Sequence, residues 1–597
     1  MVLALLVLGL AQLEGLLDNL FVYRDAANVY VIRSGQRAVL IDLAGGGVLD
    51  RLETIGVRQV DGVYLTHRDR DQWFGFQKAA ARGIPIHAPG QAVADYWRKF
   101  FPAPNGSIEY SIMAPDESAA MFDVRPGDRV RTAVGLLEAA AAPGHTRDHV
   151  AYHITVDGRK IVFSGDAIYA RGKVWQGYQL DWDHWRGQGY EAAASSLLRL
   201  RDLRPDLLAP SHGEPQREGI EETLAITAGR LWRAAELKNF DLYALERAAG
   251  LAASTPLKRL ERVRVGRLLA ERLSPHLWMC GNNYFLLDDS GACFAIDNNL
   301  DPADWPALLS RIGARHVEKI WVTHLHVDHV LRLPELKARY GAALITLRPL
   351  ADLLEHPRAY WHPWSDFDGV HPDLVLDDGA EFSWGGYRMR AYHAPGQTWF
   401  HAFLETVIDG HKAVFSGDTF QGAGLWDIAN GTGGWSGFNR GFPSYHARSV
   451  RLMRQIAPQW VLAEHERPFE FRPEEWDLRV RWAEQAARAL DELSPSGCHL
   501  LDFNPHVISM YPLIGRWSAE GQRVELRITN PLEVPLEAAW SGPASGSLRV
   551  APRATISAPL LIQVPEPPPA SRIPVTLDIT LQGRYLGPAV FFLVEKK

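Results

Sequence analysis

Cysteine is scarce in this chain, and its scarcity excludes two kinds of protein. Only three cysteines, Cys280, Cys293 and Cys498, occur among 597 residues. Their number is odd, and their spacing does not match that of paired zinc-binding cysteines. The sequence therefore predicts neither a disulfide framework nor a cysteine zinc site. Cys280 and Cys293 flank an expected hairpin and could pair, although we expect buried free thiols. A metal site in this chain would therefore use histidine and carboxylate ligands.

The chain also lacks long apolar runs and an excess of positive charge. No segment has the roughly 20 apolar residues of a transmembrane helix, so we expect no membrane span. A net charge of −7 provides no general attraction to nucleic acid. The apolar segment 1–17 has the length of a signal-peptide core without a preceding basic residue, so it is either such a signal or a first helix or strand.

Three histidines and an aspartate lie close together in the second half of the chain. His324-Leu325-His326-Val327-Asp328-His329 follows the apolar run Lys319–Val322, which predicts the end of a buried strand. Imidazole and carboxylate are preferred ligands of zinc-like divalent ions. In an extended segment His324 and His326 point the same way. A following helix would turn Asp328 and His329 toward a second point, so this stretch predicts ligands for two adjacent metals.

A similar pattern occurs earlier, which reveals an internal repeat. His67-Arg68-Asp69-Arg70-Asp71-Gln72 follows the apolar run Gly62–Leu65. In the first copy, 78, 21 and 46 residues separate His67, His145, Asp166 and His212 in turn. In the second copy, 73, 21 and 47 residues separate His324, Gln397, Asp418 and His465. Matched intervals between matched residue types predict two domains of one fold, as the length of the chain also suggests.

These motifs resemble those of the metallo-beta-lactamase superfamily. That family has His-x-His-x-Asp-His after a strand, then a Gly-His-Thr histidine, an aspartate after Ser-Gly and a final histidine. The first copy matches at Pro143–Thr146, Ser164–Asp166 and Ser211–Gly213, and the second at Pro395–Thr398, Ser416–Asp418 and Glu464–His465. The resemblance implies an α/β fold with tandem αββα sandwiches at 18–216 and 272–494. We expect a helical linker at 217–271, including its basic run at 258–264.

The last hundred residues differ in character from both copies. Arg523–Thr529 alternates between polar and apolar residues, as a half-buried strand does. Two more expected strands, Ile556–Val564 and Val575–Thr580, are separated by the turn Pro565–Pro569. Regularly spaced short strands predict an all-β sandwich at 498–597. Together with the apolar N-terminal segment, this domain favours a secreted or periplasmic location over a cytoplasmic one.

In the second copy, the resemblance implies two metal positions. Metal one would bind His324 and His326, with Gln397 in place of the third histidine. Metal two would bind Asp328, His329 and His465, and Asp418 would bridge. Because Gln397 is a weak ligand, either His393 or His401 replaces it, or the site holds only metal two. Otherwise His393 and His401 hydrogen-bond to ligands and orient them.

The first copy departs from the family's ligand pattern at other positions than the second copy does. His67, Asp69, His145 and Asp166 would form a set for metal one, and Asp71, Asp166 and His212 a set for metal two. Gln72 and His149 would orient these ligands. A carboxylate at position 69 is tolerated by zinc but shifts preference toward iron or manganese. We expect the second copy to bind metal better, and the first to be either an active site or a degenerate scaffold.

The implied activity is metal-dependent hydrolysis of an ester, thioester, lactone or amide in a small-molecule substrate. One or two zinc ions per site would lower the pKa of water to about 7, and Asp328 would hold or accept the proton. Two alternatives stay open: a non-haem iron oxidoreductase like the superfamily's persulfide dioxygenases, and a non-catalytic metal-binding scaffold. Aromatic residues after Asp166 and Asp418 either cover a substrate or join the two copies as an intramolecular pseudo-dimer.

Overall fold

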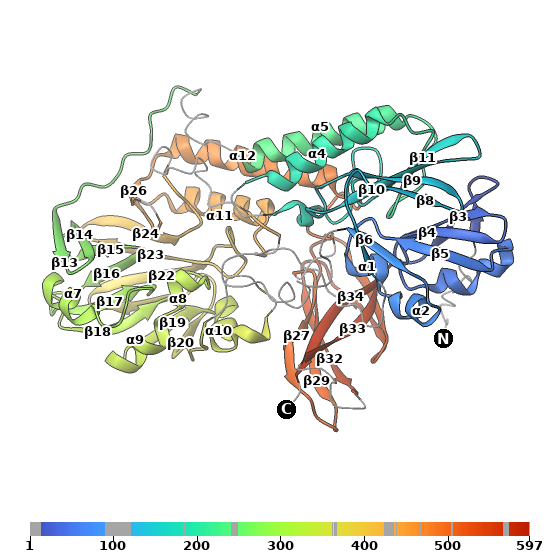
Figure 1. The fold of residues 1–597 in the computed structure, drawn as a ribbon. Coiled ribbons are helices and arrows are strands. Elements are labelled where there is room, and N and C mark those ends of the chain that lie inside the picture. The colour runs from blue at the N-terminus through green and yellow to red at the C-terminus, as the bar shows by residue number, and fades with distance from the viewer. Residues whose placement is uncertain are drawn as a thin grey trace.

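The computed structural model describes residues 13–89, 121–182, 186–239, 249–360, 362, 367–422, 435–437, 439–465, 467–502, 506–564 and 572–595. Two α/β units lie on opposite sides of the molecule, and an all-β unit lies below and between them (Figure 1). The predicted fold class is confirmed. The predictions for residues 1–12, for Pro565–Pro569 and for the aromatic segment at 426–434 lie outside the described residues.

The first unit contains two sheets. One has seven strands: β1 (Leu13–Gly15), β2 (Leu20–Arg24), β3 (Asn28–Ser34), β4 (Arg37–Ile41), β5 (Gln59–Tyr64), β6 (Ile86–Pro89) and β7 (Met121–Val124). The other has β8 (Arg129–Thr132), β9 (Gly135–Ala141), β10 (Val150–Val156), β11 (Arg159–Gly165) and β12 (Leu207–Pro210). The helices are η1 (Gly47–Asp50), η2 (Leu52–Ile55), α1 (Arg70–Trp73), α2 (Phe76–Ala81), η3 (Gly177–Leu180), α4 (Gln188–Asp202) and α5 (Ile220–Lys238).

Strand β4 shows why the strands of these sheets have apolar residues at successive positions. Side chains alternate between the two faces of a strand. Val39 and Ile41 pack between the two sheets, while Ala38 and Leu40 pack on the helix-covered face with Trp73 of α1. A strand covered on both faces needs apolar residues at every position.

The second unit repeats this plan. Its first sheet has β13 (Glu261–Val265), β14 (Leu268–Ser274), β15 (Leu277–Cys280), β16 (Asn283–Leu287), β17 (Ala292–Ile296), β18 (His316–Trp321), β19 (Ala343–Leu347) and β20 (Leu374–Leu376). Its second has β21 (Glu381–Trp384), β22 (Tyr387–His393), β23 (Ala402–Ile408), β24 (His411–Gly417), β25 (Trp460–Ala463) and β26 (Phe469–Glu470). The helices are α7 (Trp305–Ile312), α8 (Val327–Val330), α9 (Leu333–Tyr340), α10 (Arg348–Glu355), η4 (Pro357–Ala359), α11 (Pro443–Ile456) and α12 (Pro473–Leu493). Cys280 and Cys293 are buried free thiols, as expected.

The predicted helical linker is wrong over its last part. Helix α5 ends at Lys238, and strands β13 and β14 form an antiparallel hairpin that begins at Glu261. The basic run alternates in the manner of an edge strand: Val263 is buried, whereas Arg262 and Arg264 are exposed. The charges occupy the solvent face of a strand rather than of a helix.

The C-terminal unit has two sheets and packs against both copies. Its strands are β27 (Ile508–Tyr511), β28 (Ile514–Arg516), β29 (Gln522–Thr529), β30 (Leu536–Ser541), β31 (Gly546–Val550), β32 (Thr555–Ile562), β33 (Arg572–Leu581) and β34 (Arg584–Glu595). Trp175 of the first copy joins its apolar core. On the other side, Leu513 donates its backbone N–H to the carbonyl of Ala359 in the second copy.

The two copies also contact each other directly, through α5 and α12 at the top of Figure 1. Lys238 at the end of α5 donates to Asp181 Oδ1 (2.7 Å) and to the carbonyl of Trp435 in the second copy. Among the described helices, none has the length and apolarity needed to cross a membrane.

In both copies, the motif loop, the predicted bridging aspartate and the last histidine lie where parallel strands end, whereas His145 and Gln397 lie in loops between antiparallel strands. Strands β4 and β5, and likewise β11 and β12, are parallel neighbours in the first copy. The pairs β17–β18 and β24–β25 have the same arrangement in the second. The carboxyl ends of parallel strands meet at one edge of a sheet. The fold therefore brings together motif residues up to about 145 positions apart in sequence.

Candidate metal centres in the two copies

The loop after β18 has the turn that the sequence predicts. His326 is extended (φ −64°, ψ 146°), and α8 begins at the next residue. Asp69, at the same position of the first copy, has nearly the same backbone angles and precedes α1. The change from extended chain to helix directs the first two ligands of each motif to one point and the last two to another.

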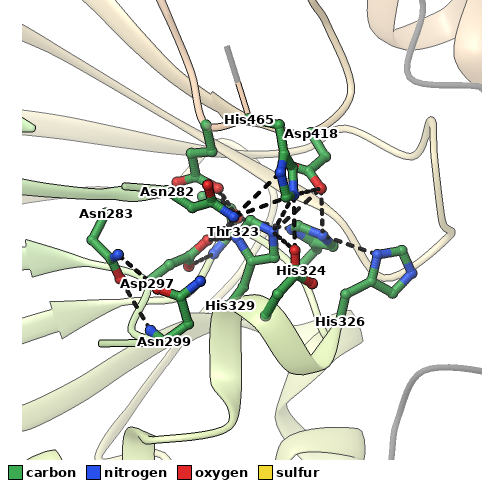
Figure 2. Close-up of polar contacts among 12 residues, drawn as sticks. Asn282, Asn283, Asp297, Asn299, Thr323, His324, His326, His329, Asp418 and His465 are labelled. Atoms are coloured by element: carbon green, nitrogen blue, oxygen red, sulfur yellow. Dashed lines mark hydrogen bonds and ion pairs between the residues drawn. The ribbon is translucent and has the colours of Figure 1, made fainter. Parts of the chain in front are cut away.

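In the second copy, four residues form a compact cluster at the metal-two position. His465 Nε2 lies 2.8 Å from Asp328 Oδ2 and 3.0 Å from Asp418 Oδ2. His329 Nε2 lies 3.3 Å and 3.2 Å from the same two oxygen atoms. All four ligand atoms lie within 4.8 Å of one another. Figure 2 shows His329 of α8, Asp418 after β24 and His465 after β25 converging on one point.

The metal-one half of the second copy is less complete. His324, His326 and Asp418 form a cluster, with His324 Nε2 3.2 Å from His326 Nδ1. Gln397 donates from Nε2 to Asp418 Oδ2 at 3.4 Å. Its Oε1 is buried and accepts no hydrogen bond from the described residues. Gln397 thus lies where a third imidazole is expected, but its amide N–H donates to Asp418, the predicted bridging carboxylate.

The carboxylates of this site change the protonation of the histidines. Burial alone would lower the pKa of His465, but Asp418 and Asp328 raise it to about 10. Burial raises the pKa of Asp328, but His329 and His465 outweigh burial and hold it well below its usual range. In the absence of metal, the carboxylates of this site therefore favour the protonated, positively charged form of His465.

Two buried carboxyl groups support His329 from behind. Its Nδ1 lies 2.9 Å from Asp297 Oδ2 and 3.0 Å from Glu464 Oε2. Asp297 also accepts hydrogen bonds from the backbone N–H (2.7 Å) and hydroxyl (2.5 Å) of Thr323. These contacts leave Nε2 of His329 as the nitrogen that faces the cluster.

In the first copy, a cluster forms at the metal-one position. His145 Nε2 lies 2.9 Å from Asp69 Oδ2, and His67 Nε2 lies 3.8 Å from the same atom. These three residues form a group of potential ligands. Asp166 Oδ2 lies 3.3 Å from His67 Nε2 and 3.6 Å from His145 Nε2. Asp166 therefore lies beside this group and offers a further carboxylate oxygen as a potential metal ligand.

The other predicted ligands of the first copy, Asp71 and His212, join no such group among the described residues. His212 Nδ1 lies 2.7 Å from Asp166 Oδ1, and its Nε2 lies 2.9 Å from the carbonyl of Ala26. Because both partners only accept, both ring nitrogens donate and neither offers a lone pair to a metal. Gln72 donates to Asp166 Oδ2 at 3.3 Å, and its Oε1 is buried and unpaired in the described structure.

Three further histidines named from the sequence belong to none of the groups of potential ligands among the described residues. His149 accepts the backbone N–H of Asp166 at Nε2 (3.1 Å) and so orients that aspartate. Its counterpart His401 stacks on His324 with ring centroids 4.9 Å apart. Each ring lies so close to the glycine of the Ser-Gly-Asp motif, Gly165 or Gly417, that a Cβ there would clash. His393 faces the carbonyl of Trp399 (2.8 Å), away from the clusters.

Sequence reasoning missed several polar residues around the second centre. Asn282 Nδ2 lies 3.3 Å from His465 Nε2, and Asn439 accepts from His326 Nε2 at 3.0 Å. Asp297 and its first-copy counterpart Asp42 had a signal that could have identified them. Each directly follows an apolar strand, β17 or β4. An acidic residue there in both copies indicates a shared role, and both accept the backbone N–H of the motif threonine.

Comparison with known proteins agrees with this geometry. A family model described as the metallo-beta-lactamase superfamily matches residues 22–212 and 279–459, more than half of the chain. Hydroxyacylglutathione hydrolase of Brucella anthropi is 32% identical over 167 residues, 28% of this chain and 57% of that protein. Atrochrysone carboxyl ACP thioesterase of a Cryptosporiopsis species is 28% identical over 178 residues, 29% of this chain and 49% of that protein. The chain spans about half the length of the curated relatives it matches.

The solved structures to which parts of the chain are similar include metallo-beta-lactamases. BJP-1, a subclass B3 enzyme of Bradyrhizobium japonicum, has 16% sequence identity and a TM-score of 0.28, covering 40% of this chain and 94% of that one. SMB-1, in complex with mercaptoacetic acid, has 16% identity and a TM-score of 0.31, covering 38% and 95%. On the evidence of the family match, this chain belongs to the metallo-beta-lactamase superfamily and carries two tandem copies of its domain.

Proposed function

We propose that the chain is a metal-dependent hydrolase whose working site is the metal-two cluster of the second copy. The observation that carries this proposal is access. The side chains of Asp328 and His465 are 41% and 26% exposed. In the first copy the cluster is covered: the side chain of Asp69 is 11% exposed and that of His145 is 2% exposed. A substrate can reach the second cluster directly.

The residues of the second cluster fit a divalent ion. Two imidazoles and two carboxylates match the nitrogen and oxygen ligands that zinc accepts. Asp418 Oδ1 is buried and has no hydrogen-bond partner among the described residues, so the ligand set has spare acceptor capacity. A bound ion supplies hydroxide near neutral pH by lowering the pKa of water to about 7.

The chain's own residues would handle the proton and the substrate. Asp328 is partly exposed and ionised, so its carboxylate can hold a water at the open side of the cluster by accepting a hydrogen bond from that water. Asn282 can donate from its side-chain amide beside His465 to negative charge that develops on a carbonyl oxygen. Asp297 and Glu464 hold His329 in place, which preserves the geometry during turnover.

The names of two relatives favour thioesters among the candidate substrates. One relative is named a hydroxyacylglutathione hydrolase and the other an acyl carrier protein thioesterase. Both names describe cleavage of an acyl–sulfur bond. We therefore place a thioester first, followed by oxygen esters, lactones and amides, and propose zinc as the ion.

The test is hydrolysis by the full zinc-loaded chain of hydroxyacylglutathione, an acyl carrier protein thioester, an aryl ester, a lactone and a β-lactam. We expect thioester cleavage that Asp328→Asn lowers by at least about 100-fold. Asp289→Asn makes the same chemical change at a fully exposed carboxylate of the same copy and should leave the rate unchanged. Absence of turnover on every substrate, or equal rates in the two variants, would contradict the proposal.

A further inference from the structure

We infer that the first copy holds a closed, structural metal ion that fastens the C-terminal β unit to this copy. The inference concerns the set His67, Asp69, His145 and Asp166 and does not depend on the proposed hydrolase. It assigns the two copies different work, with the second copy open to substrate and the first serving as a joint.

Three potential ligand atoms, from His67, Asp69 and His145, lie close enough together to hold one ion, and Asp166 lies beside the two histidines. Zinc bonds to nitrogen and oxygen of about 2.0–2.2 Å place tetrahedral ligand atoms about 3.3–3.6 Å apart. The four measured separations between a histidine nitrogen and a carboxylate oxygen are 2.9, 3.3, 3.6 and 3.8 Å. His67 Nε2 is buried and faces the carboxylate oxygens of Asp166 (3.3 Å) and Asp69 (3.8 Å). Imidazole nitrogens and carboxylate oxygens that converge away from solvent form a position that a divalent ion can occupy.

The site is closed, as structural metal sites are. The side chains of His67 and Asp166 have no exposed surface. Gln179 of η3 donates to Asp69 Oδ2 at 3.1 Å and covers the least buried of the four ligands. Gln72 donates to Asp166 Oδ2 and occupies the side where a second metal would bind. Asp166, Gln72 and Gln179 thus surround the three clustered ligands and cover the position of the ion.

One line of contacts leads from this site to the C-terminal unit. His212 bonds to Asp166 Oδ1, and its ring stacks on Trp175 with centroids 4.2 Å apart and planes 14° apart. Arg584 of β34 lies over the Trp175 ring, with its guanidinium carbon 3.8 Å from the ring centroid. The position of Asp166 therefore determines the surface that β34 meets.

A second line of contacts starts from the motif itself. Arg70 lies between Asp69 and Asp71 and donates to the carbonyl of Ala589 in β34 at 3.4 Å. Its guanidinium carbon also lies 5.1 Å from the ring centroid of Phe591. The C-terminal unit contacts the second copy elsewhere, where Tyr511 donates to Asp352 of α10 (2.9 Å). A metal that orders the first motif and Asp166 would therefore order both contact lines to β34.

The experiment is hydrogen exchange of the full chain, with chelator and with zinc, combined with elemental analysis. In the wild type, we expect zinc to slow amide exchange in β33 and β34 by about tenfold or more, because binding to the folded state stabilises it. His145→Gln introduces the residue that the second copy has at this position. This variant should lose one zinc per chain and the zinc-dependent protection of β33 and β34.

Two further variants separate the joint from general destabilisation. His465→Ala should lose the other zinc but keep the zinc-dependent protection of β33 and β34. Trp175→Leu should keep both zinc ions yet lose most of that protection, because the stacked path is broken. Protection that persists in His145→Gln, or that is absent from the wild type, would overturn the inference. Neither readout depends on turnover, so the hydrolase proposal can fail without affecting this result.

Discussion

The two copies have one framework and opposite defects. In the first, Gln72 replaces an imidazole of metal two, and in the second, Gln397 replaces an imidazole of metal one. Each glutamine donates from Nε2 to Oδ2 of the bridging aspartate, at 3.3 Å and 3.4 Å. Each also has a buried Oε1 without a partner in the described structure. In each copy, a glutamine at the position of a family histidine therefore donates its amide N–H to the aspartate that is predicted to bridge.

The copies also differ in what surrounds the remaining cluster. Strand β34 packs on the motif helix of the first copy. In the second copy, the cluster lies at the other metal position and includes the partly exposed side chains of Asp328 and His465. Duplication thus allowed one site to be closed while the other stayed open.

Matched substitutions of the bridging aspartates should have the largest effect. Asp418→Asn removes the carboxylate shared by His324, His329 and His465, so we expect hydrolysis to fall by at least about 100-fold. Asp166→Asn should mainly lower the zinc content and the melting temperature, because its cluster is closed. Steady-state kinetics, elemental analysis and calorimetry on both variants measure the difference. If Asp166→Asn abolished hydrolysis while Asp418→Asn retained it, the roles of the copies would be reversed.

Restoring the missing histidines should affect the copies unequally. Gln397→His completes a set with His324 and His326, and we expect zinc content to rise by about one ion per chain. Gln72→His should add none, because His212 donates to Ala26 and cannot ligate there. Elemental analysis of the two variants beside the wild type decides the point. An extra ion in Gln72→His would show that the first copy keeps a usable second position.

Competition between protons and metal should act on both copies alike. Burial would lower the pKa of His67 and His465, but carboxylates raise it to about 9 and about 10. In the metal-free chain, their stabilising effect is complete below the unfolded pKa of about 6.5 and is lost as pH rises through the raised values. We expect the free energy of unfolding with chelator to fall from pH 6.5 to 10, while zinc affinity rises.

Urea unfolding at several pH values and zinc titration calorimetry test this expectation. Substituting His67 or His465 by alanine should weaken the pH dependence of the metal-free chain. A metal-free chain whose stability rose over this pH window would contradict the charge arrangement described for both centres.

The smallest expected effect concerns the two arginines that the β unit stacks on aromatic rings. Arg584 covers Trp175 of the first copy, whereas Arg527 covers Tyr511 within the β unit (3.4 Å). Alanine at either position should cost about 1–2 kcal/mol of unfolding free energy. Only Arg584→Ala should also reduce zinc-dependent protection of β34 in hydrogen exchange. Equal effects on that protection would remove the distinction between the two contacts.

The sequence predicted the parts of this structure that repeat or alternate. The strand-end motifs placed His324, Asp418 and His465 together because parallel strands end at one edge. The alternation of Arg523–Thr529 likewise predicted β29. The charged composition of the basic run predicts a solvated helix face, but the run forms part of strand β13, in which Val263 is buried between exposed arginines. Its partner β14 pairs with β15 as β1 pairs with β2 in the first copy, and β13 adds one more strand at that edge than the described first copy has.

What sequence could not predict depends on contacts between distant residues. The orientation of His212 is determined by Ala26, which lies 186 positions away. The closure of the first site involves Arg584, which no motif connects to Asp166. Glu464 precedes a predicted ligand, but its contact with His329 arises only when β25 lies beside the motif loop. Such features depend on how separate units dock, and local patterns do not encode that docking.

The most direct test of the account is anomalous X-ray scattering at the zinc edge from crystals of the zinc-loaded full chain. We predict two peaks per chain: one among His67, Asp69, His145 and Asp166, and one among Asp328, His329, Asp418 and His465. Paired peaks about 3.5–4 Å apart in either copy would show a two-metal site and contradict the account. So would a first copy without a peak, because the closed metal joint would then not exist.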